Sequence, residues 1–279
     1  MRLISASDQD VRFWDLATGA ELTRSSRYPG INGIAAFTVG ERVVVAIATE
    51  RGLSWWDPDV TEAPYPDSNV GTLWGVTIAS ISGQPAGVFG AAQLDPYPVC
   101  RWDPRSGRPQ DPIGHHSECV KDVTAGIVLN RPIVVSGDDG GLVRRWDLLA
   151  GSEFGRPLGG PEPVFSLALL STVNDGAIIV SADRASIIQR WDAITGERIG
   201  TQYGAHDGGI IALAAIPLPD GPQLLSTGFD GVVRRWDGET GALVDAVGNG
   251  YAATAITSDD AVLVAFGDDQ ISVREIDQS

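Results

Sequence analysis

Short apolar runs alternate with turn residues along the whole chain. Two clear examples are VFSLALLSTVNDGAIIVSADRASIIQRWDAITGERIG, over 164–200, and IIALAAIPLPDGPQLLSTGFDGVVRRWDGETGALVDAVG, over 210–248. Each contains an apolar run, a turn, a second apolar run, a tight turn rich in Asp or Gly, and an alternating segment; a Thr-Gly turn and a weaker fourth run follow. Runs of this length that are rich in Val and Ile, and bounded by Gly, Pro and Asp, are typical of β-strands. The pattern therefore predicts four short strands in each repeat of about 45 residues.

The dipeptide Trp-Asp marks the end of the third predicted strand in each repeat. It occurs six times, at intervals of 42 to 46 residues, and a degenerate copy follows at Ile276-Asp277. The third strands are therefore predicted to end near residues 14, 56, 102, 146, 191, 236 and 276. A fixed period of this length indicates an array in which each repeat buries its apolar face against its neighbours.

The segments around Trp-Asp are similar to those of a known family. DVRFWDLATG, GLVRRWD, SIIQRWD and GVVRRWD resemble the third strand and the following turn of WD-repeat β-propeller proteins, in particular those of actinobacteria. The resemblance implies an all-β fold, a seven-bladed β-propeller of four-stranded antiparallel blades. It also implies that residues 1–279 form a single domain.

The two ends of the chain depart from this pattern. The sequence starts within a second strand, RLISAS, and stops just after a third strand, ISVREID, so we expect incomplete first and last blades. Three-stranded blades would expose an unpaired strand edge. A missing N-terminal segment, a trimmed sequence or pairing with a strand of another chain are the alternatives.

Composition limits the class of partner. The formal net charge is −16, which opposes binding to a phosphate backbone, so we expect no nucleic-acid partner. Arg is used almost to the exclusion of Lys, which occurs once, at Lys121; this bias is typical of a GC-rich bacterial genome. No apolar stretch approaches the length of a membrane span, and no signal peptide is evident. With two cysteines and no disulfide framework, a cytoplasmic location is expected.

One repeat contains the full set of bracing residues that the family resemblance implies. In that family, His, Ser or Thr, and Asp form a hydrogen-bonded relay that ends on the indole N–H of the Trp, because a buried donor must be satisfied. The matching residues here are His206, Ser226, Asp230 and Trp236. His, Ser and Asp also make up hydrolytic triads, but Ser226 lies in the middle of a predicted strand. We interpret the set as structural and expect no catalytic residue.

The starts of the first strands are the predicted binding region. We place them with the pattern apolar-x-x-apolar, which occurs as INGI, LWGV, VKDV, VFSL, IIAL and AATA. In propellers, loops entering these strands border the mouth of the central channel. Aromatic side chains at a concave site are typical of recognition surfaces. The predicted binding residues are Asn32, Trp74, His116, Lys121, Phe165, Ile211 and Tyr251.

Two functions are consistent with this sequence. The resemblance favours a non-enzymatic scaffold that binds a protein or peptide at the channel mouth, with no cofactor, no metal and no membrane partner. The alternative is a small-molecule-binding or enzymatic propeller, in which the aromatic residues form an apolar pocket at the central channel and Lys121 or His116 supplies the polar contact. Fold alone does not decide between them.

Overall fold

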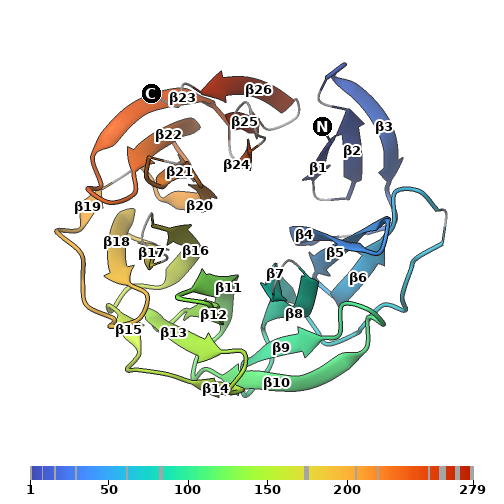
Figure 1. The fold of residues 1–279 in the computed structure, drawn as a ribbon, viewed down its shortest axis with the longest axis horizontal. Coiled ribbons are helices and arrows are strands. Elements are labelled where there is room, and N and C mark those ends of the chain that lie inside the picture. The colour runs from blue at the N-terminus through green and yellow to red at the C-terminus, as the bar shows by residue number, and fades with distance from the viewer. Residues whose placement is uncertain are drawn as a thin grey trace. The chain divides into compact units, whose positions relative to one another are not determined.

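The structure is a computed structural model in which most of the chain is described. The described residues are 2–7, 9–15, 17–28, 30–60, 62–81, 84–172, 176–204, 206–218, 220–250, 252–257, 262–267 and 271–276, the last three ranges as backbone. The regular elements of these residues are strands, β1 to β26 (Figure 1). The prediction of an all-β protein is confirmed.

The first of two compact units comprises Met1–Ala125 and Ala150–Ser152. It contains two sheets of three strands, ordered β1-β2-β3 and β4-β5-β6, and one of four strands, ordered β7-β8-β9-β10. The strands are β1 (Arg2–Ala6), β2 (Val11–Asp15), β3 (Ala20–Ser25), β4 (Ile31–Val39), β5 (Arg42–Thr49), β6 (Gly52–Trp56), β7 (Leu73–Ile81), β8 (Gln84–Ala92), β9 (Pro98–Trp102) and β10 (Pro109–His115). Strand pairs are antiparallel, in sequence order.

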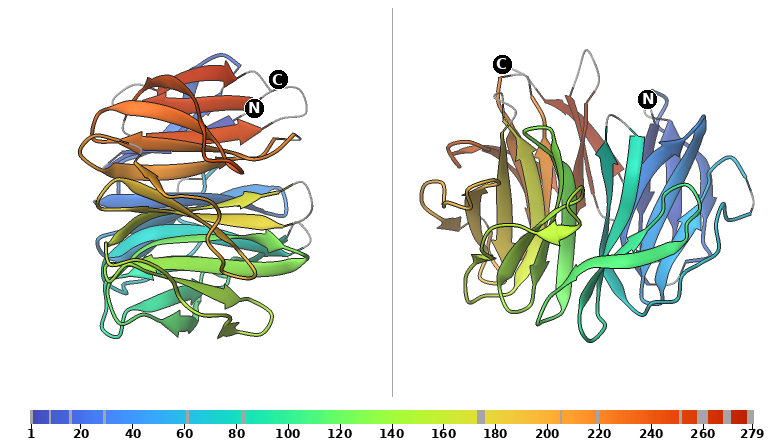
Figure 2. Two further views of the ribbon diagram at one scale, coloured as in Figure 1. Left: turned by 90° about the vertical axis from the view of Figure 1, so that its left-hand side faces the viewer. Right: turned by 60° about the horizontal axis from the view of Figure 1, so that its bottom comes forward.

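The second unit comprises Gly126–Leu149 and Glu153–Ser279. Its first sheet begins at the boundary between the units and has the order β11-β12-β13-β14, and β15 also pairs with β13. Strands β16 to β19 form a four-stranded sheet, and so do β20 to β23. Strands β24 to β26 form a three-stranded sheet. The strands are β11 (Val120–Val128), β12 (Arg131–Asp138), β13 (Leu142–Asp147), β14 (Ser152–Glu153), β15 (Leu158–Gly159), β16 (Val164–Ser171), β17 (Ala177–Asp183), β18 (Ile187–Asp192), β19 (Tyr203–Gly204), β20 (Ile210–Ile216), β21 (Gln223–Gly228), β22 (Val232–Asp237), β23 (Leu243–Asn249), β24 (Ala252–Thr257), β25 (Val262–Gly267) and β26 (Ile271–Ile276). Figure 2 shows the twist of these antiparallel sheets from two further directions.

The prediction of seven four-stranded blades is wrong, because the sheets have three, four or five strands. The departure is clearest in the sheet β4 to β6, where the Pro-rich, acidic run after Trp56 predicts an irregular edge in place of a fourth strand. The segment 57–70 replaces it and makes a single antiparallel bridge, between Leu53 and Ser68. Pro58, Pro64 and Pro66 lie in this segment, and proline cannot donate a hydrogen bond to a strand ladder. The sheets β1 to β3 and β24 to β26, nearest the two ends, have three strands each, in agreement with the expectation of incomplete first and last blades.

The Trp residues of the repeat fill the space between neighbouring sheets. In the second unit, Trp236 packs with buried residues of β16 to β18, among them Leu170 and Ile178. Trp191 in turn packs with Ile133 and Val135 of β12. Because each indole joins one sheet to the sheet before it, the core continues from repeat to repeat, as nearest-neighbour packing in a repeat array requires.

Buried arginines add a second connection between successive sheets. Arg145, next to Trp146, is 1% exposed. Its Nη1 donates to the carbonyl oxygens of Ala193, over 3.1 Å, and Ile194, over 2.8 Å. Its Nη2 donates to the carbonyl oxygen of Arg156 over 3.2 Å. Ala193 and Ile194 belong to the turn that follows Trp-Asp in the next sheet. Burial lowers the pKa of the Arg145 guanidinium from its usual value. The group is therefore held by carbonyl oxygens that accept from Nη1 and Nη2, while its buried Nε has no hydrogen-bond partner among the described residues.

Arg190 repeats this arrangement one sheet later. Its guanidinium donates to the carbonyl oxygens of the next Trp-Asp turn, at Glu239 and, over 2.8 Å, at Thr240. The two arginines stand in equivalent places, immediately before Trp146 and Trp191, and both are buried. In these two sheets the arginine before the Trp therefore forms what we call an arginine latch to the next sheet, in addition to the packing of the Trp. Arg235, in the equivalent place one sheet later, instead pairs with Asp245 of its own sheet.

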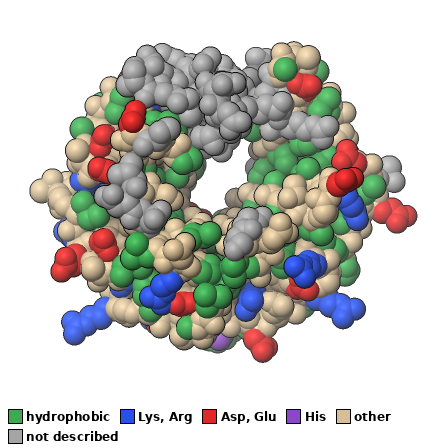
Figure 3. Space-filling view, viewed as in Figure 1, with side chains coloured by type: hydrophobic (Ala, Val, Ile, Leu, Met, Phe, Trp, Pro, Cys, Tyr) green, Lys and Arg blue, Asp and Glu red, His purple; other side chains and the backbone are tan. Residues whose placement is uncertain are grey.

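Charged side chains are dispersed over the described surface. On the face drawn in Figure 3, Lys and Arg side chains lie singly among Asp and Glu, without a continuous patch of either sign in the coloured part. Among the described residues, no helix is long and apolar enough to cross a membrane. The same part of the chain contains no group of three His, Cys, Asp or Glu side chains placed to hold a metal ion.

Candidate binding site at the starts of the first strands

Four first strands carry a β-bulge at the same place, near the start of the strand. In β4, for example, Ile31 pairs with Thr49 and Gly33 with Ala48, so Asn32 is left between two pairs. The residues in this position are Asn32 in β4, Trp74 in β7, Phe165 in β16 and Ile211 in β20. A bulge leaves its extra residue out of the ladder and re-aims that side chain. Four of the seven predicted binding residues thus share one backbone irregularity.

In the first unit, the bulge residues of β4 and β7 lie in a row with Lys121 of β11. The Asn32 Nδ2 donates to the Leu73 carbonyl oxygen over 2.9 Å, and the Lys121 Nζ lies 4.6 Å from the centroid of the Trp74 ring. Trp74 is 37% exposed. We call Asn32, Trp74 and Lys121 the Trp74 row. An exposed cation–π contact of this kind contributes about 0.5–1 kcal/mol, which favours one orientation of the ring.

Glycine keeps the strands of the Trp74 row close together. A Cβ on Gly33 would lie 3.5 Å from the Cα of Gly75, so β4 and β7 approach backbone to backbone. A Cβ on Gly75 would lie 2.9 Å from the Asp122 Oδ1, and that oxygen already accepts a hydrogen bond from the Val123 N–H. A Cβ at Gly33 would make ordinary contact, whereas a Cβ at Gly75 would displace the Asp122 carboxylate, so the spacing of the row is more sensitive to Gly75.

The second unit contains the other two bulge residues, on neighbouring strands. Phe165 and Ile211 are partly exposed, and the Ser166 Oγ accepts a hydrogen bond from the Leu213 N–H over 3.1 Å, which connects β16 to β20. Phe229, which we did not predict from the sequence, lies beside them: it is 63% exposed and its N–H donates to the Gly209 carbonyl oxygen over 3.0 Å. The available signal was an aromatic residue directly before the Asp-Gly turn of this repeat.

Two predicted binding residues are placed differently. His116 is buried, after the end of β10, and its N–H donates to the Tyr97 carbonyl oxygen over 3.0 Å. Tyr251 lies outside the described residues. The described structure therefore joins Asn32, Trp74 and Lys121 in one unit, and it places Phe165 and Ile211 on adjacent strands in the other.

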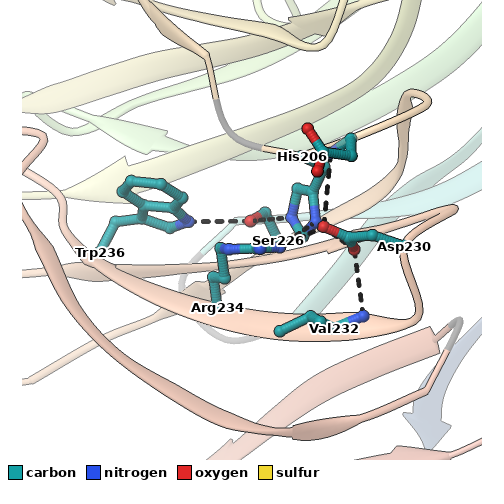
Figure 4. A network of polar contacts seen from close by, with 7 residues as sticks. His206, Ser226, Asp230, Val232, Arg234 and Trp236 are labelled. Carbon is teal, nitrogen blue, oxygen red and sulfur yellow. Dashed lines mark hydrogen bonds and ion pairs between the residues drawn. The ribbon is translucent and has the colours of Figure 1, made fainter.

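The bracing residues of the sheet β20 to β23 form a continuous relay (Figure 4). The Trp236 Nε1–H donates to the Ser226 Oγ over 2.8 Å; that oxygen is 2.7 Å from the His206 Nε2, and the His206 Nδ1 is 2.8 Å from the Asp230 Oδ1. With Nδ1–H donating to Asp230, Nε2 accepts from the Ser226 hydroxyl; the Arg234 Nη1, which donates to the Asp230 Oδ2, also lies 2.6 Å from Nδ1. Ser226 is wholly buried, so its hydroxyl satisfies the indole and is not presented to a substrate.

Other indoles also donate to a serine of the second strand or its neighbourhood. Trp146 and Trp191 donate to the Ser ten residues earlier, Ser136 and Ser181, over 2.8 and 3.3 Å. Trp14 donates to Ser5 over 2.8 Å. The serine of the second strand is therefore the recurrent partner of the Trp, and His206 is an addition to it in the sheet β20 to β23.

Electrostatics shift two groups of the relay. Burial lowers the pKa of His206, and the hydrogen bond to Asp230 only partly counters this. Burial acts to raise the pKa of Asp230, but hydrogen bonds from His206, Arg234 and the Val232 N–H together hold it well below its usual range. His206 is therefore neutral in the folded protein at neutral pH, while Asp230 is ionised and paired with Arg234.

We expect the lowered pKa of His206 to make the fold sensitive to mild acid. Below its ordinary value of 6.5, the unfolded chain takes up a proton that the folded chain resists, so the free energy of unfolding falls as the pH drops through this range. The effect of Asp230 comes later, below 3.8. Urea unfolding at about pH 7.5 and about pH 5.5 should show a smaller loss of stability in His206→Gln than in the natural chain. His115→Gln, at an exposed histidine, is the control; a loss in His206→Gln equal to that of the control would contradict the assignment.

Comparisons with known proteins support the repeat and the fold. Residues 196–237 match the family model described as "WD domain, G-beta repeat". A search of curated protein sequences found no match. Among solved structures, the crystal structure of the computationally designed Ika8 protein is similar over 99% of this chain and 93% of its own, with a TM-score of 0.65 and 19% sequence identity. At that identity the likeness concerns the fold alone.

Proposed function

We propose that this chain, which has a β-propeller fold and matches the WD-repeat family model over residues 196–237, is a non-enzymatic scaffold that binds a protein or peptide through the starts of its first strands. The observation that carries the proposal is the repeated bulge, which aims Asn32, Trp74, Phe165 and Ile211 out of the strand ladders. Among these positions, the Trp74 row is the principal contact in the first unit.

The chemistry of the Trp74 row suits a peptide. An indole that is partly exposed offers a large, rigid apolar surface, and Trp is enriched among the residues that dominate binding energy at interfaces. Lys121 beside it favours an acidic or carbonyl-bearing partner. In the second unit, Phe165, Ile211 and the exposed Phe229 offer apolar contacts without a cation. The two groups are accordingly expected to contact different side chains of the partner.

The relay of His206, Ser226 and Asp230 supports a non-enzymatic role. A nucleophilic serine must be exposed beside donors that stabilise the oxyanion. Ser226 is buried against Trp236 and His206 and is engaged by both. A net charge of −16 also disfavours a nucleic acid as the partner.

Peptide selection tests the proposed function. A library of displayed peptides is selected against the natural chain, and the enriched peptides are synthesised and their affinities measured by fluorescence polarisation. We expect enriched sequences in which an apolar or aromatic residue neighbours an acidic one, and we expect unlabelled peptides from the same selection to compete with one another for one site. Enrichment of strongly basic peptides that bind by charge alone would contradict the proposal.

A further inference from the structure

A separate polar pocket lies beside the sheet β4 to β6. Its volume is about 250 Å³, and it is bounded by residues from three segments: the connection that leads into β4, the turn between β5 and β6 with the start of β6, and the segment that stands in for a fourth strand. We call it the Arg51 pocket. The side chains that matter here are Arg27, Arg51, Ser54, Asp67, Ser68 and Asn69.

The Arg51 pocket exists because the fourth strand is missing. Ser68 pairs with Leu53 through two backbone hydrogen bonds, of 3.0 and 2.8 Å, and the chain then turns away from β6. Gly52 permits this approach: its φ is +136°, and a Cβ there would lie 1.9 Å from the Ser68 carbonyl oxygen. The backbone of Gly52 and Ser68 therefore forms one wall, and side chains of neighbouring residues surround the space that a regular strand would have filled.

The lining is rich in hydrogen-bond donors that the described protein does not use. The exposed Arg51 guanidinium has no hydrogen bond or ion pair to any described residue, and the hydroxyls of Ser54 and Ser68 and the amide of Asn69 are likewise without described side-chain partners. Arg27 makes a 3.4 Å contact from its Nη2 to the Trp55 carbonyl oxygen, and its guanidinium carbon lies 4.9 Å from the centroid of the Tyr28 ring. Two guanidinium groups and three neutral polar groups thus converge on one small space within an acidic protein.

From these donors we infer that the Arg51 pocket binds a small oxyanion, a phosphate or carboxylate, that carries a hydrogen-bond donor next to its anionic group. The planar guanidinium matches both oxyanions through paired N–H donors. The volume is below the range of about 300–1,000 Å³ typical of sites for larger ligands, so the ligand is a small molecule or one modified side chain. Asp67, the carboxylate in the lining, accepts a hydrogen bond from the neighbouring ammonium or hydroxyl of the ligand and disfavours a bare dianion.

Calorimetric titration at low ionic strength tests this inference with inorganic phosphate, O-phospho-L-serine and L-serine as probes. We expect O-phospho-L-serine to bind more tightly than inorganic phosphate, because its ammonium group can contact Asp67. Arg51→Gln should weaken binding at least tenfold, since it removes a charge-assisted pair of hydrogen bonds. Arg51 is exposed and makes no described side-chain contact, so this variant should fold normally. Arg184→Gln, at an exposed arginine of the second unit, is the matched control and should bind as the natural chain does.

A second variant separates the role of Asp67 from general attraction of anions. Asp67→Asn removes the repulsive charge, so inorganic phosphate should bind several-fold more tightly while O-phospho-L-serine loses its advantage. If L-serine binds and Arg51→Gln weakens that binding, the pocket is assigned to carboxylates. If inorganic phosphate binds and Arg51→Gln weakens that binding, the pocket is assigned to phosphates. The inference is overturned if none of the probes binds, or if Arg51→Gln and Arg184→Gln bind equally well. Neither outcome bears on peptide binding at the Trp74 row, which uses other residues.

Discussion

Replacing Arg145 with methionine is expected to lower the free energy of unfolding by about 3–5 kcal/mol. The substitution keeps an unbranched apolar stem but removes the hydrogen bonds to the carbonyl oxygens of Arg156, Ala193 and Ile194. The buried carbonyl groups then lack a donor inside the protein. The free-energy cost of these unsatisfied acceptors exceeds the gain from no longer burying the charge of the guanidinium. Urea unfolding followed by tryptophan fluorescence measures the change.

The neighbouring arginine provides the control. Arg144 lies on the other face of β13 and makes a partly exposed ion pair with Glu153, over 2.7 Å. Arg144→Met should therefore cost about 1 kcal/mol or less. Arg145→Lys should also be destabilising, because a single ammonium cannot reproduce the fork that reaches three carbonyl groups. Equal losses in Arg144→Met and Arg145→Met would contradict the latch between successive sheets.

Replacing Trp74 with alanine is expected to weaken the binding of a selected peptide by about 10- to 100-fold, with little effect on folding. The ring is the largest partly exposed apolar surface of the Trp74 row, and it lies at an unpaired bulge position, where its removal leaves the strand ladder intact. The same change frees the Lys121 ammonium from the ring, which it now contacts at 4.6 Å. Fluorescence polarisation with the labelled peptide measures the loss.

Three further variants define the extent of the surface. Lys121→Gln should weaken binding less than Trp74→Ala and should reduce its dependence on salt, because an exposed charge acts mainly on association. Asn32→Ala should have an intermediate effect, since it loosens the contact to the Leu73 carbonyl oxygen. Leu149→Ala, at an apolar side chain that is 69% exposed elsewhere, is the control and should bind normally. A Leu149→Ala loss as large as that of Trp74→Ala would contradict the assignment.

Much of the fold was predictable because one physical requirement recurs in several repeats. In the sheets that contain Trp146, Trp191 and Trp236, the buried indole donates to a serine ten residues earlier. Trp102 has Ala92 at that position, and its buried Nε1 has no partner among the described residues. The first strands carry a subtler signal. The apolar-x-x-apolar spacing of INGI or LWGV is one residue longer than the alternation of a regular strand, and the extra residue is the one in the bulge.

The remaining features depend on contacts between distant segments and had no local pattern. The Pro-rich, acidic run after Trp56 is the exception, because it predicts an irregular edge beside β6, where the structure has a single bridge at Ser68. The Arg51 pocket combines residues from three separate segments, none of which is distinctive alone. Phe229 occupies a turn position where the corresponding repeats have small or polar residues; this contrast was a signal, but it does not show which strand the ring lies beside.

Hydrogen–deuterium exchange of the chain, alone and with a saturating selected peptide, tests the central claim most directly. The account predicts slower exchange of backbone amides at the starts of β4 and β7, around Asn32 and Trp74, with the outer strands β3 and β10 unchanged, and it predicts that this protection disappears in Trp74→Ala. Protection confined to the outer strands, or protection at β4 and β7 that persists undiminished in Trp74→Ala, would contradict the proposal that this protein binds its partner through the Trp74 row.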